Sequence, residues 1–179
     1  MAAGFPNDGK PGRFGACRFD TVATRIVIIG GGPAGYEAAL VAAAHERSTT
    51  EVTVIDSDGI GGACVLFDCV PSKTFIASTG VRTDLRRAPN LGFDIDVEHA
   101  KISLPQIHSR VKRLASEQSA DIADRLRSAG VRLIAGRAEL VDHVVGMAFH
   151  RIKASLPDGS STILEADVVL IATGASPRV

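Results

Sequence analysis

Two cysteines lie close together in a segment that begins with glycine and ends with lysine. Cys64 and Cys69 stand in the run Gly-Gly-Ala-Cys-Val-Leu-Phe-Asp-Cys-Val-Pro-Ser-Lys, from Gly61 to Lys73. A pair of neighbouring thiols can close to a disulfide and reopen, which releases and stores two electrons. In a regular helix, α-carbons five residues apart are about 8 to 9 Å apart, beyond the ~7 Å that a disulfide spans. We therefore expect Cys64 on a distorted turn and Cys69 in a regular helix that continues through Ala77.

Other uses of these thiols are possible. A metal site would need more thiolate or imidazole ligands at suitable spacing, and the neighbouring sequence has none, so we expect no metal. Two inert cysteines in the core remain an alternative, because a free cysteine is often buried as a small apolar group. The third cysteine, Cys17, has no second cysteine nearby and is expected to be a free thiol.

A glycine-rich turn precedes the cysteines. The β-branched run Arg25–Ile29 predicts a buried parallel strand, and Gly30-Gly31-Gly32-Pro33-Ala34-Gly35 after it matches G-x-G-x-x-G. An alanine-rich helix should follow from Ala34 to Arg47, with Pro33 in its first turn. The first glycine permits the sharp turn, the second lets the backbone approach a pyrophosphate, and the third lets helix and strand pack closely.

An acidic residue ends the next predicted strand. Glu51–Ile55 is followed by Asp56, about where a dinucleotide-binding fold places a carboxylate that accepts hydrogen bonds from ribose hydroxyls. We interpret Asp56 as an adenosine ligand. The alternative is a turn residue, since Asp56-Ser57-Asp58-Gly59 is a good turn sequence by itself.

Composition narrows the class of protein. The 179 residues suit one globular domain, and the 20 acidic and 20 basic residues cancel, so nucleic acid or an anionic membrane is not the expected partner. The expected partner is a small molecule. With three cysteines and no run of 18 apolar residues, we expect a soluble protein of the reducing cytoplasm that does not insert into a membrane. Residues 1–24 are rich in glycine and proline and predict a flexible extension ahead of a domain at 25–179.

The rest of the chain predicts one long helix and further strands. Ser103 to Gln106 reads as a capping box, and apolar residues recur at helical spacing from Leu104 to Ala129, before Gly130. On its polar face we expect Arg113 with Glu117, and Asp121 with Arg125, to form ion pairs.

The carboxyl-terminal third reads as β-structure. Val131–Ile134 predicts a parallel strand, and residues 136–165 predict an antiparallel meander that turns at Pro157-Asp158-Gly159. The last strand should run from Asp167 to Ala172. The fold class is therefore α/β, a Rossmann-like fold with a parallel sheet and an antiparallel β-meander.

Three motifs in this order resemble the class I pyridine nucleotide-disulfide oxidoreductases, such as dihydrolipoamide dehydrogenase and glutathione reductase. They are the glycine turn from Gly30, the C-x4-C-x-P-S-K run, and the segment from Glu165 to Arg178, in which a strand ends in Ala-Thr-Gly. The resemblance covers Arg25 to Val179. It implies that the Rossmann-like fold is an FAD-binding fold, with FAD as cofactor and NAD(P)H as co-substrate of the full-length enzyme.

The resemblance also implies roles for single residues. Cys69 would face the flavin, Cys64 would exchange with substrate, and Lys73 would lie near the flavin N5 unless it is simply a surface lysine. The residues expected to bind cofactor are Gly30, Gly32, Pro33, Ala34, Gly35, Asp56, Gly61, Gly62, Lys73, Ala172, Thr173 and Gly174.

The chain also departs from the family pattern. Ala63 stands where the family commonly has threonine, and Leu66, Phe67 and Asp68 replace small residues between the cysteines. A carboxylate about 4 Å from the Cys69 thiol would oppose its ionisation by about 1 to 4 kcal/mol, depending on the dielectric. These departures favour the branch of the family that reduces quinones.

The expected activity is therefore transfer of two electrons from NAD(P)H through FAD to a disulfide or a quinone. The sequence reaches only Val179, where the family's NAD(P)-binding domain would begin, and a homodimer is expected only for a full-length form. The alternative is a truncated remnant, or an FAD-binding module without turnover. The five histidines are expected on the surface or in loops: His45, His99, His108, His143 and His150.

Overall fold

The computed structural model describes four stretches of the chain, residues 23–44, 49–96, 99–141 and 149–175. Several expectations fall outside these ranges: the extension over residues 1–22, Cys17, His45, His143, the last residues of the first helix, and the end of the third motif beyond Ala175. All statements about the fold below concern the described residues.

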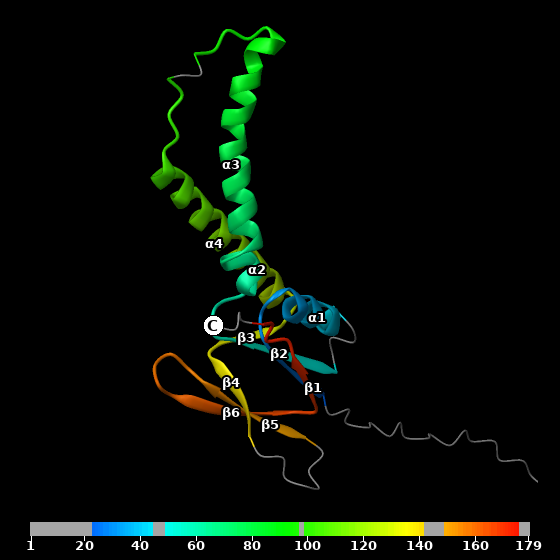
Figure 1. The fold of residues 1–179 in the computed structure, drawn as a ribbon. Coiled ribbons are helices and arrows are strands. Elements are labelled where there is room, and N and C mark those ends of the chain that lie inside the picture. Colours follow the sequence, from blue (N-terminus) through cyan, green and yellow to red (C-terminus); the bar gives the residue numbers. More distant parts are fainter. Residues whose placement is uncertain (1–22, 45–48, 97–98, 142–148, 176–179) are drawn as a thin grey trace, which may run out of the picture.

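A four-stranded parallel sheet, sheet A, forms the centre of the body (Figure 1). Its strands are β1 (Thr24–Ile29), β2 (Thr50–Asp56), β3 (Arg132–Ala135) and β7 (Val168–Ile171), in the order β3-β2-β1-β7. Helix α1 (Pro33–Ala44) connects the first two strands. The predicted α/β fold with its parallel sheet is confirmed, and each predicted strand differs from the observed one by only a residue or two at its ends.

A smaller antiparallel sheet, sheet B, lies against the first. It consists of β4 (Arg137–Val141), β5 (His150–Ser155) and β6 (Ser161–Ala166), paired in chain order. The tight turn before β6 is made by Gly159 at a φ of 85°, and the Leu156 N–H donates to the Ser160 carbonyl at 2.8 Å. The predicted meander and its turn are therefore confirmed.

The two faces of sheet A are covered differently. On one face Ile28 and Val54 pack with Ala39 of α1 and Leu126 of the long helix α4 (Leu104–Ser128). On the other face Val27, Ile55 and Ile134 pack against sheet B, with Ile152, Ala154 and Ala166 completing that cluster. Adjacent strand residues serve opposite faces because side chains alternate along a strand. The result is three layers: helices, sheet A, sheet B.

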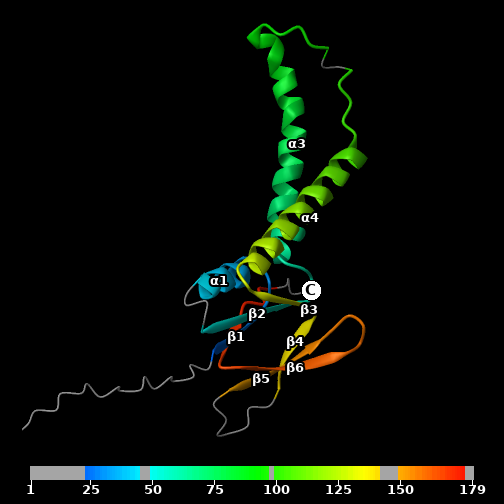
Figure 2. The ribbon, with the colours of Figure 1, turned by 180° about the vertical axis from the view of Figure 1, so that it is seen from behind.

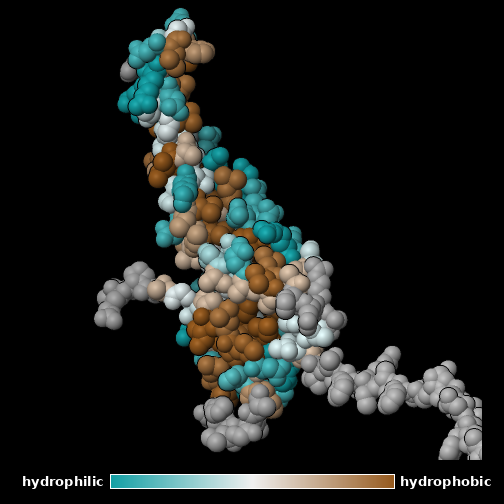
Figure 3. Space-filling view, turned by 90° about the vertical axis from the view of Figure 1, so that its right-hand side faces the viewer, coloured by the Kyte–Doolittle hydropathy of each residue, from teal (hydrophilic) through white to brown (hydrophobic). Residues whose placement is uncertain are grey.

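A helical pair projects from this body, as the two opposite views show (Figures 1 and 2). Short helix α2 (Gly62–Leu66) leads into α3 (Cys69–Arg87), which is followed by the 3-10 turn η1 (Ala88–Leu91) and, after residues 92–103, by α4. Helix α3 has no buried residue, whereas the second half of α4 returns to the core. The face seen in Figure 3 also carries a continuous apolar area on the body below the helical pair.

Two local predictions for α4 are wrong. Ser103 precedes the helix as expected, but its side chain makes no capping hydrogen bond, because the Gln106 side chain lines a cavity between the helices instead of completing a capping box. The Arg113–Glu117 ion pair forms at 2.9 Å. Among the described ion pairs, however, Asp121–Arg125 is absent, and the pair in the last turns of α4 joins Arg127 to Asp124 at 2.7 Å.

Candidate dinucleotide and redox site

At two positions of the glycine turn, Gly30 and Gly35, the packing leaves no room for a side chain. Gly30 has a φ of 110°, and a Cβ there would lie 2.2 Å from the carbonyl oxygen of Ala172. A Cβ on Gly35 would lie 1.8 Å from the Gly30 carbonyl oxygen, whereas a Cβ on Gly32 would meet nothing within 4 Å. The predicted sharp turn and close helix–strand packing are confirmed. The open space at Gly32 suits a bound group, and its approach by a pyrophosphate stays a prediction.

The Asp56 carboxylate ties the glycine turn to the end of β2. Its Oδ2 accepts a hydrogen bond from the Gly31 N–H at 2.6 Å, and its Oδ1 accepts from the N–H groups of Asp58 and Gly59 at 2.8 and 2.7 Å. The turn interpretation of Asp56 is thus confirmed. A carboxylate has about four acceptor positions, so room remains for a ribose hydroxyl, and that role stays a prediction.

A cavity of about 220 Å³ opens beside Asp56 at the carboxyl ends of the parallel strands. Gly30, Asp56 and Thr173 line it, together with Gly136 and Arg137 from the junction of β3 and β4. Open parallel sheets bind ligands at this edge. The cavity is smaller than the roughly 300 Å³ of the smallest drug-sized sites, so it suits one part of a dinucleotide rather than all of it.

Gly136 and Arg137 were not predicted from the sequence to line the site. One feature of the sequence could have indicated them: Gly136 stands between a parallel strand and the first strand of the meander, where the chain is expected to reverse at the carboxyl edge of the sheet. A Cβ at Gly136 would lie 2.5 Å from the Ser155 carbonyl oxygen, so the glycine is needed for sheet B to fold against this edge.

The helix is interrupted between the two cysteines, as the span of a disulfide required. The N–H groups of Phe67 and Asp68 both donate to the Ala63 carbonyl, at 3.0 and 2.8 Å, which closes α2. Asp68 adopts a non-helical conformation, with φ −126° and ψ −87°, and α3 starts at Cys69. The predicted interruption between the cysteines and the regular helix from Cys69 are confirmed, although α3 extends to Arg87, well past Ala77. The predicted distorted turn at Cys64 is wrong: Cys64 lies in the short helix α2, and the distortion falls at Phe67 and Asp68.

The cysteine segment starts in direct contact with the glycine turn. The Gly61 N–H donates to the Gly31 carbonyl at 2.8 Å, and a Cβ on Gly62 would lie 2.8 Å from the Gly32 α-carbon. From the other side, the Ser119 hydroxyl of α4 donates to the Ile60 carbonyl at 2.5 Å. These contacts hold the start of α2 between the glycine turn and α4.

Both thiols are free and half-buried, and neither belongs to the two core clusters. This argues against the inert core interpretation. Hydrogen bonding to Cys69 raises the pKa of the Cys64 thiol above its ordinary value, and burial and the charge of Cys69 add to the rise. Lys73 acts in the opposite direction, and Asp68 adds a small further rise. The Asp68 carboxylate thus acts on Cys64, and its predicted effect on Cys69 stays a prediction.

The remaining predicted site residues gather around the turn. The Ala172 N–H donates to the Ile29 carbonyl at 2.8 Å, which extends the pairing of β7 with β1 and brings Thr173 to the cavity. Gly174 follows with a φ of 69°. Pro33 and Ala34 are exposed at the start of α1, and Lys73 is exposed on the first turns of α3.

The described part of the chain has three further features of interest: its histidines, its potential metal ligands, and the length and polarity of its helices. The described histidines are exposed, and His99 contacts Asp96 at 2.6 Å. Within the described ranges, no group of three or more histidine, cysteine and acidic side chains could hold a metal ion. The helices in those ranges are each too short or too polar to cross a membrane.

Three features together define a Rossmann-type FAD-binding fold. They are the parallel sheet with a glycine turn at its carboxyl edge, the carboxylate at the end of the next strand, and the meander packed behind them. The segment that carries the two thiols starts in contact with that turn, through Gly61 and Gly62. The sequence pattern of the pyridine nucleotide-disulphide oxidoreductases matches residues 24–179, and the chain belongs to this family.

Several known proteins are similar to the chain. It is 72% identical over 156 residues to an NAD(P)H dehydrogenase (quinone) of Mycobacterium tuberculosis, covering 87% of this chain and 32% of that protein. It is 33% identical to a dihydrolipoyl dehydrogenase of Chlorobaculum tepidum, over 89% of this chain and 32% of that protein. A crystal structure of LpdA from M. tuberculosis superposes with a TM-score of 0.81 at 69% identity, over 88% of this chain and 33% of the other. The chain thus spans about a third of the length of these relatives.

Proposed function

We propose that this chain forms the FAD-binding part of a flavoprotein oxidoreductase that carries two electrons from NAD(P)H through FAD to a small acceptor. The observation that supports this best is the contact between the cysteine segment and the glycine turn, made by Gly61 with Gly31 and by Gly62 with Gly32. A dinucleotide held by that turn would lie at the start of the segment that carries both thiols.

The residues present fit the cofactor. The space around Gly32 and the start of α1 would receive the pyrophosphate, with the Ala34 N–H as a donor and Pro33, which has no N–H, at the first helical position. The free acceptor position of Asp56 would receive a ribose hydroxyl, and Thr173 lies across the same cavity. FAD, when bound, supplies a ring that accepts a hydride and stores two electrons.

The thiols are suited to pass electrons on. When the two cysteines form a disulfide they release two electrons and two protons, and an acceptor disulfide or quinone takes up both pairs. Its raised pKa keeps the Cys64 thiol protonated near neutral pH, so Cys64 would hold a proton. The cation of Lys73 favours the thiolate and would ease release of that proton.

We favour a quinone as the acceptor. The chain is more similar to the quinone-reducing relative, at 72% identity, than to the dihydrolipoyl dehydrogenase, at 33%. In addition, Phe67 is 68% exposed at the break between α2 and α3. An exposed aromatic ring beside the thiols offers a flat apolar surface on which a planar aromatic acceptor can stack.

The alternative is a truncated non-catalytic remnant, or an FAD-binding module without turnover. We also propose, from the resemblance, that the protein acts in the cytoplasm and that a longer form is a homodimer. Neither proposal affects the tests below.

Cofactor binding is tested by purifying the chain and recording its visible spectrum, then titrating FAD by flavin fluorescence. Yellow protein, or uptake of one FAD per chain, is expected. Asp56→Ala should weaken FAD binding about tenfold or more, since a charge-assisted hydrogen bond is lost. Asp94→Asn is the control, because Asp94 is exposed after η1 and does not line the cavity beside Asp56. Colourless protein that takes up no FAD would refute the FAD site.

The acceptor is tested on a longer form of the protein that reacts with NAD(P)H. A water-soluble naphthoquinone and lipoamide are compared as acceptors in the parent protein and in Cys64→Ser. We expect the naphthoquinone to be the better acceptor. Dithionite titration of the oxidised protein should consume two electrons for the flavin and two for a disulfide between Cys64 and Cys69, and uptake by the flavin alone would rule out a working relay.

A further inference from the structure

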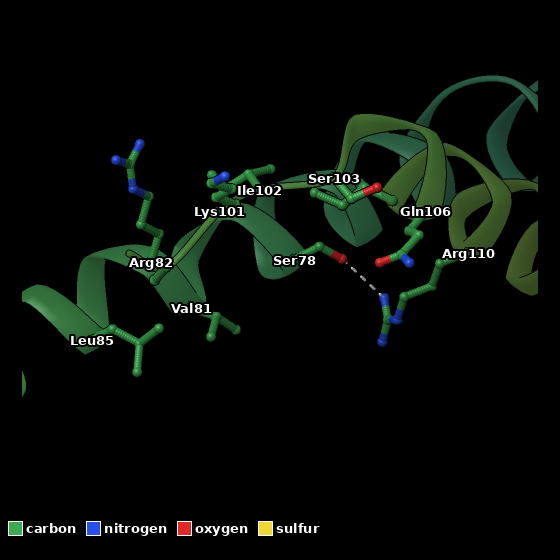
Figure 4. Close-up of a pocket in the computed structure, with 11 residues that line it drawn as sticks. Ser78, Val81, Arg82, Leu85, Lys101, Ile102, Ser103, Gln106 and Arg110 are labelled. Carbon is green, nitrogen blue, oxygen red and sulfur yellow. Dashed lines mark hydrogen bonds between the residues drawn. The ribbon is translucent and has the colours of Figure 1, made fainter. Parts of the chain in front are cut away.

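A second cavity, of about 310 Å³, lies in the helical pair, apart from the dinucleotide and redox site (Figure 4). Three segments form it: α3 from Ser78 to Leu85, residues 100–103, and the first turns of α4. Its volume is at the lower end of the range for small-molecule sites. Neither the glycine turn nor the thiols contribute to its lining, so the proposed function leaves it unexplained.

The middle of this cavity is apolar. Val81 is 55% exposed and Ile102 is 41% exposed, and both line the cavity together with Leu85 and Ile107. Figure 4 shows the Val81 side chain between those of Leu85 and Ser78 along α3. Covering apolar side chains with another apolar group is favourable by about 25 cal/mol for each Å² removed from water. The cavity therefore suits a ligand with an apolar body.

Among the described residues that line the cavity, the charged ones are basic: Arg82, Lys101 and Arg110. In the described part of the chain, the ion pairs of basic side chains involve Arg25, His99, Arg113 and Arg127, and none of the three cavity cations. A carboxylate or phosphate could therefore pair with them without displacing an existing partner.

Several polar groups gather at the α4 end of the cavity. The Arg110 guanidinium donates to the Ser78 hydroxyl at 3.2 Å, which orients it across the gap between α4 and α3. Gln106 lies beside Arg110, whereas Arg82 lies at the opposite end (Figure 4). An anionic head would thus meet Arg110 with a hydroxyl and an amide nearby, while the rest of the ligand covers Val81 and Leu85.

We propose that this cavity binds an amphipathic organic anion, with an apolar chain or ring and one carboxylate or phosphate head. Free fatty acids and anionic phospholipids share this chemistry. The proposal does not depend on FAD or on the cysteines.

The test uses the whole chain and isothermal titration with decanoate, with decanol as the uncharged analogue. One decanoate should bind per chain, and decanol should bind about tenfold more weakly or not at all, since it lacks the charge. Arg110→Met and Lys101→Met should each weaken decanoate binding, Arg110→Met by about tenfold. Arg113→Met is the matched control: it removes a cation from the same helix that already pairs with Glu117, and decanoate binding should be unchanged.

Sedimentation with phosphatidylglycerol vesicles, against phosphatidylcholine vesicles, separates the two sources. Decanoate binding lost in Arg110→Met supports a free anion. Binding to phosphatidylglycerol alone, lost in the same variant, supports a lipid headgroup. The proposal is overturned if neither probe binds, if binding is indifferent to Arg110 and Lys101, or if decanol binds as well as decanoate. Far-ultraviolet circular dichroism checks that each variant is folded. We expect all of them to fold, because the replaced side chains are exposed.

Discussion

Asp167 accepts three hydrogen bonds from Arg25 and joins the start of β7 to the start of β1. Its Oδ2 accepts from the Arg25 backbone N–H at 2.7 Å and from Nε at 3.2 Å, and its Oδ1 accepts from Nη2 at 3.0 Å. The two residues are 142 positions apart in the chain. This pairing sets the register of β7 on β1, and at the far end of the same two strands Ala172 packs on Gly30. The Arg25–Asp167 pair thus helps to place the third motif beside the glycine turn.

The first prediction concerns the pH dependence of stability. Hydrogen bonds from the Arg25 side chain and backbone lower the pKa of Asp167 to about 2. A lowered pKa in the folded state means that the stabilising contribution is present above the ordinary carboxyl value near 4 and is lost as pH falls toward 2. Asp167→Asn should therefore unfold at a lower temperature than the parent protein at pH 7. The two melting temperatures should converge between pH 4 and pH 2, as followed by circular dichroism.

Asp124→Asn is the control for that experiment. Asp124 also pairs with an arginine, but on the exposed surface of α4, where an ion pair contributes little. Its melting curve should follow that of the parent protein. A constant difference between Asp167→Asn and the parent at all pH values would contradict the assigned role.

The second prediction contrasts two glycines in helices. Gly35→Ala would put a Cβ 1.8 Å from the Gly30 carbonyl oxygen, so α1 must move away from the glycine turn. We expect a loss of about 3 kcal/mol or more in unfolding free energy, and no FAD binding. Gly80→Ala, in α3, meets nothing within 4 Å and should add up to about 1 kcal/mol through helix propensity. Urea unfolding measures both, and equal effects of the two changes would contradict the packing.

The third prediction concerns the link between α4 and the cysteine segment. Ser119→Ala removes the hydrogen bond to the Ile60 carbonyl and should lower the free energy of unfolding by about 1 kcal/mol. Because Ile60 lies between Asp56 and Gly61, FAD affinity should fall as well. Ser116→Ala changes an exposed hydroxyl on the same helix and should stay within about 0.5 kcal/mol of the parent protein. Unchanged FAD affinity in Ser119→Ala would show that this contact does not position the site.

The fourth prediction uses the reactivity of Cys64. Its raised pKa means that alkylation by iodoacetamide should reach half its maximal rate at a higher pH than an ordinary thiol does. Lys73→Met should shift that midpoint further up, and Asp68→Asn should shift it down, because the two charges act in opposite directions. Mass spectrometry of the peptide containing Cys64 separates it from the other cysteines.

Asp84→Asn serves as the control for this series, because it lies on the same helix but is not among the groups that act on Cys64. A midpoint that moves in the same direction in Lys73→Met and Asp68→Asn would contradict the electrostatic account.

Much of the local structure followed from residues that are neighbours in the sequence. The β-branched run after Thr24 predicted β1, the three glycines predicted the turn, and the span of a disulfide predicted an interrupted helix between Cys64 and Cys69, though not that the break falls at Phe67 and Asp68. These depend on backbone preferences and short-range geometry, which the nearby residues decide. Where a side chain had a choice of partners the prediction was less successful: Gln106 lines a cavity instead of capping, and Arg127, not Arg125, forms the ion pair near the end of α4.

What only the tertiary structure decided is which distant groups meet. The strand order β3-β2-β1-β7 brings Ala172 onto Gly30 and places Arg137 at the cavity of Asp56. The arrangement of α2 and α3 brings Asp68 near enough to raise the pKa of Cys64, and the divergence of α3 from α4 opens the basic cavity at Arg110. The sequence by itself determined the turns, the strands and the thiol spacing, because each is set within a few residues. The contacts between them depend on crossovers and sheet packing that join residues far apart in the chain, and no local pattern encodes those.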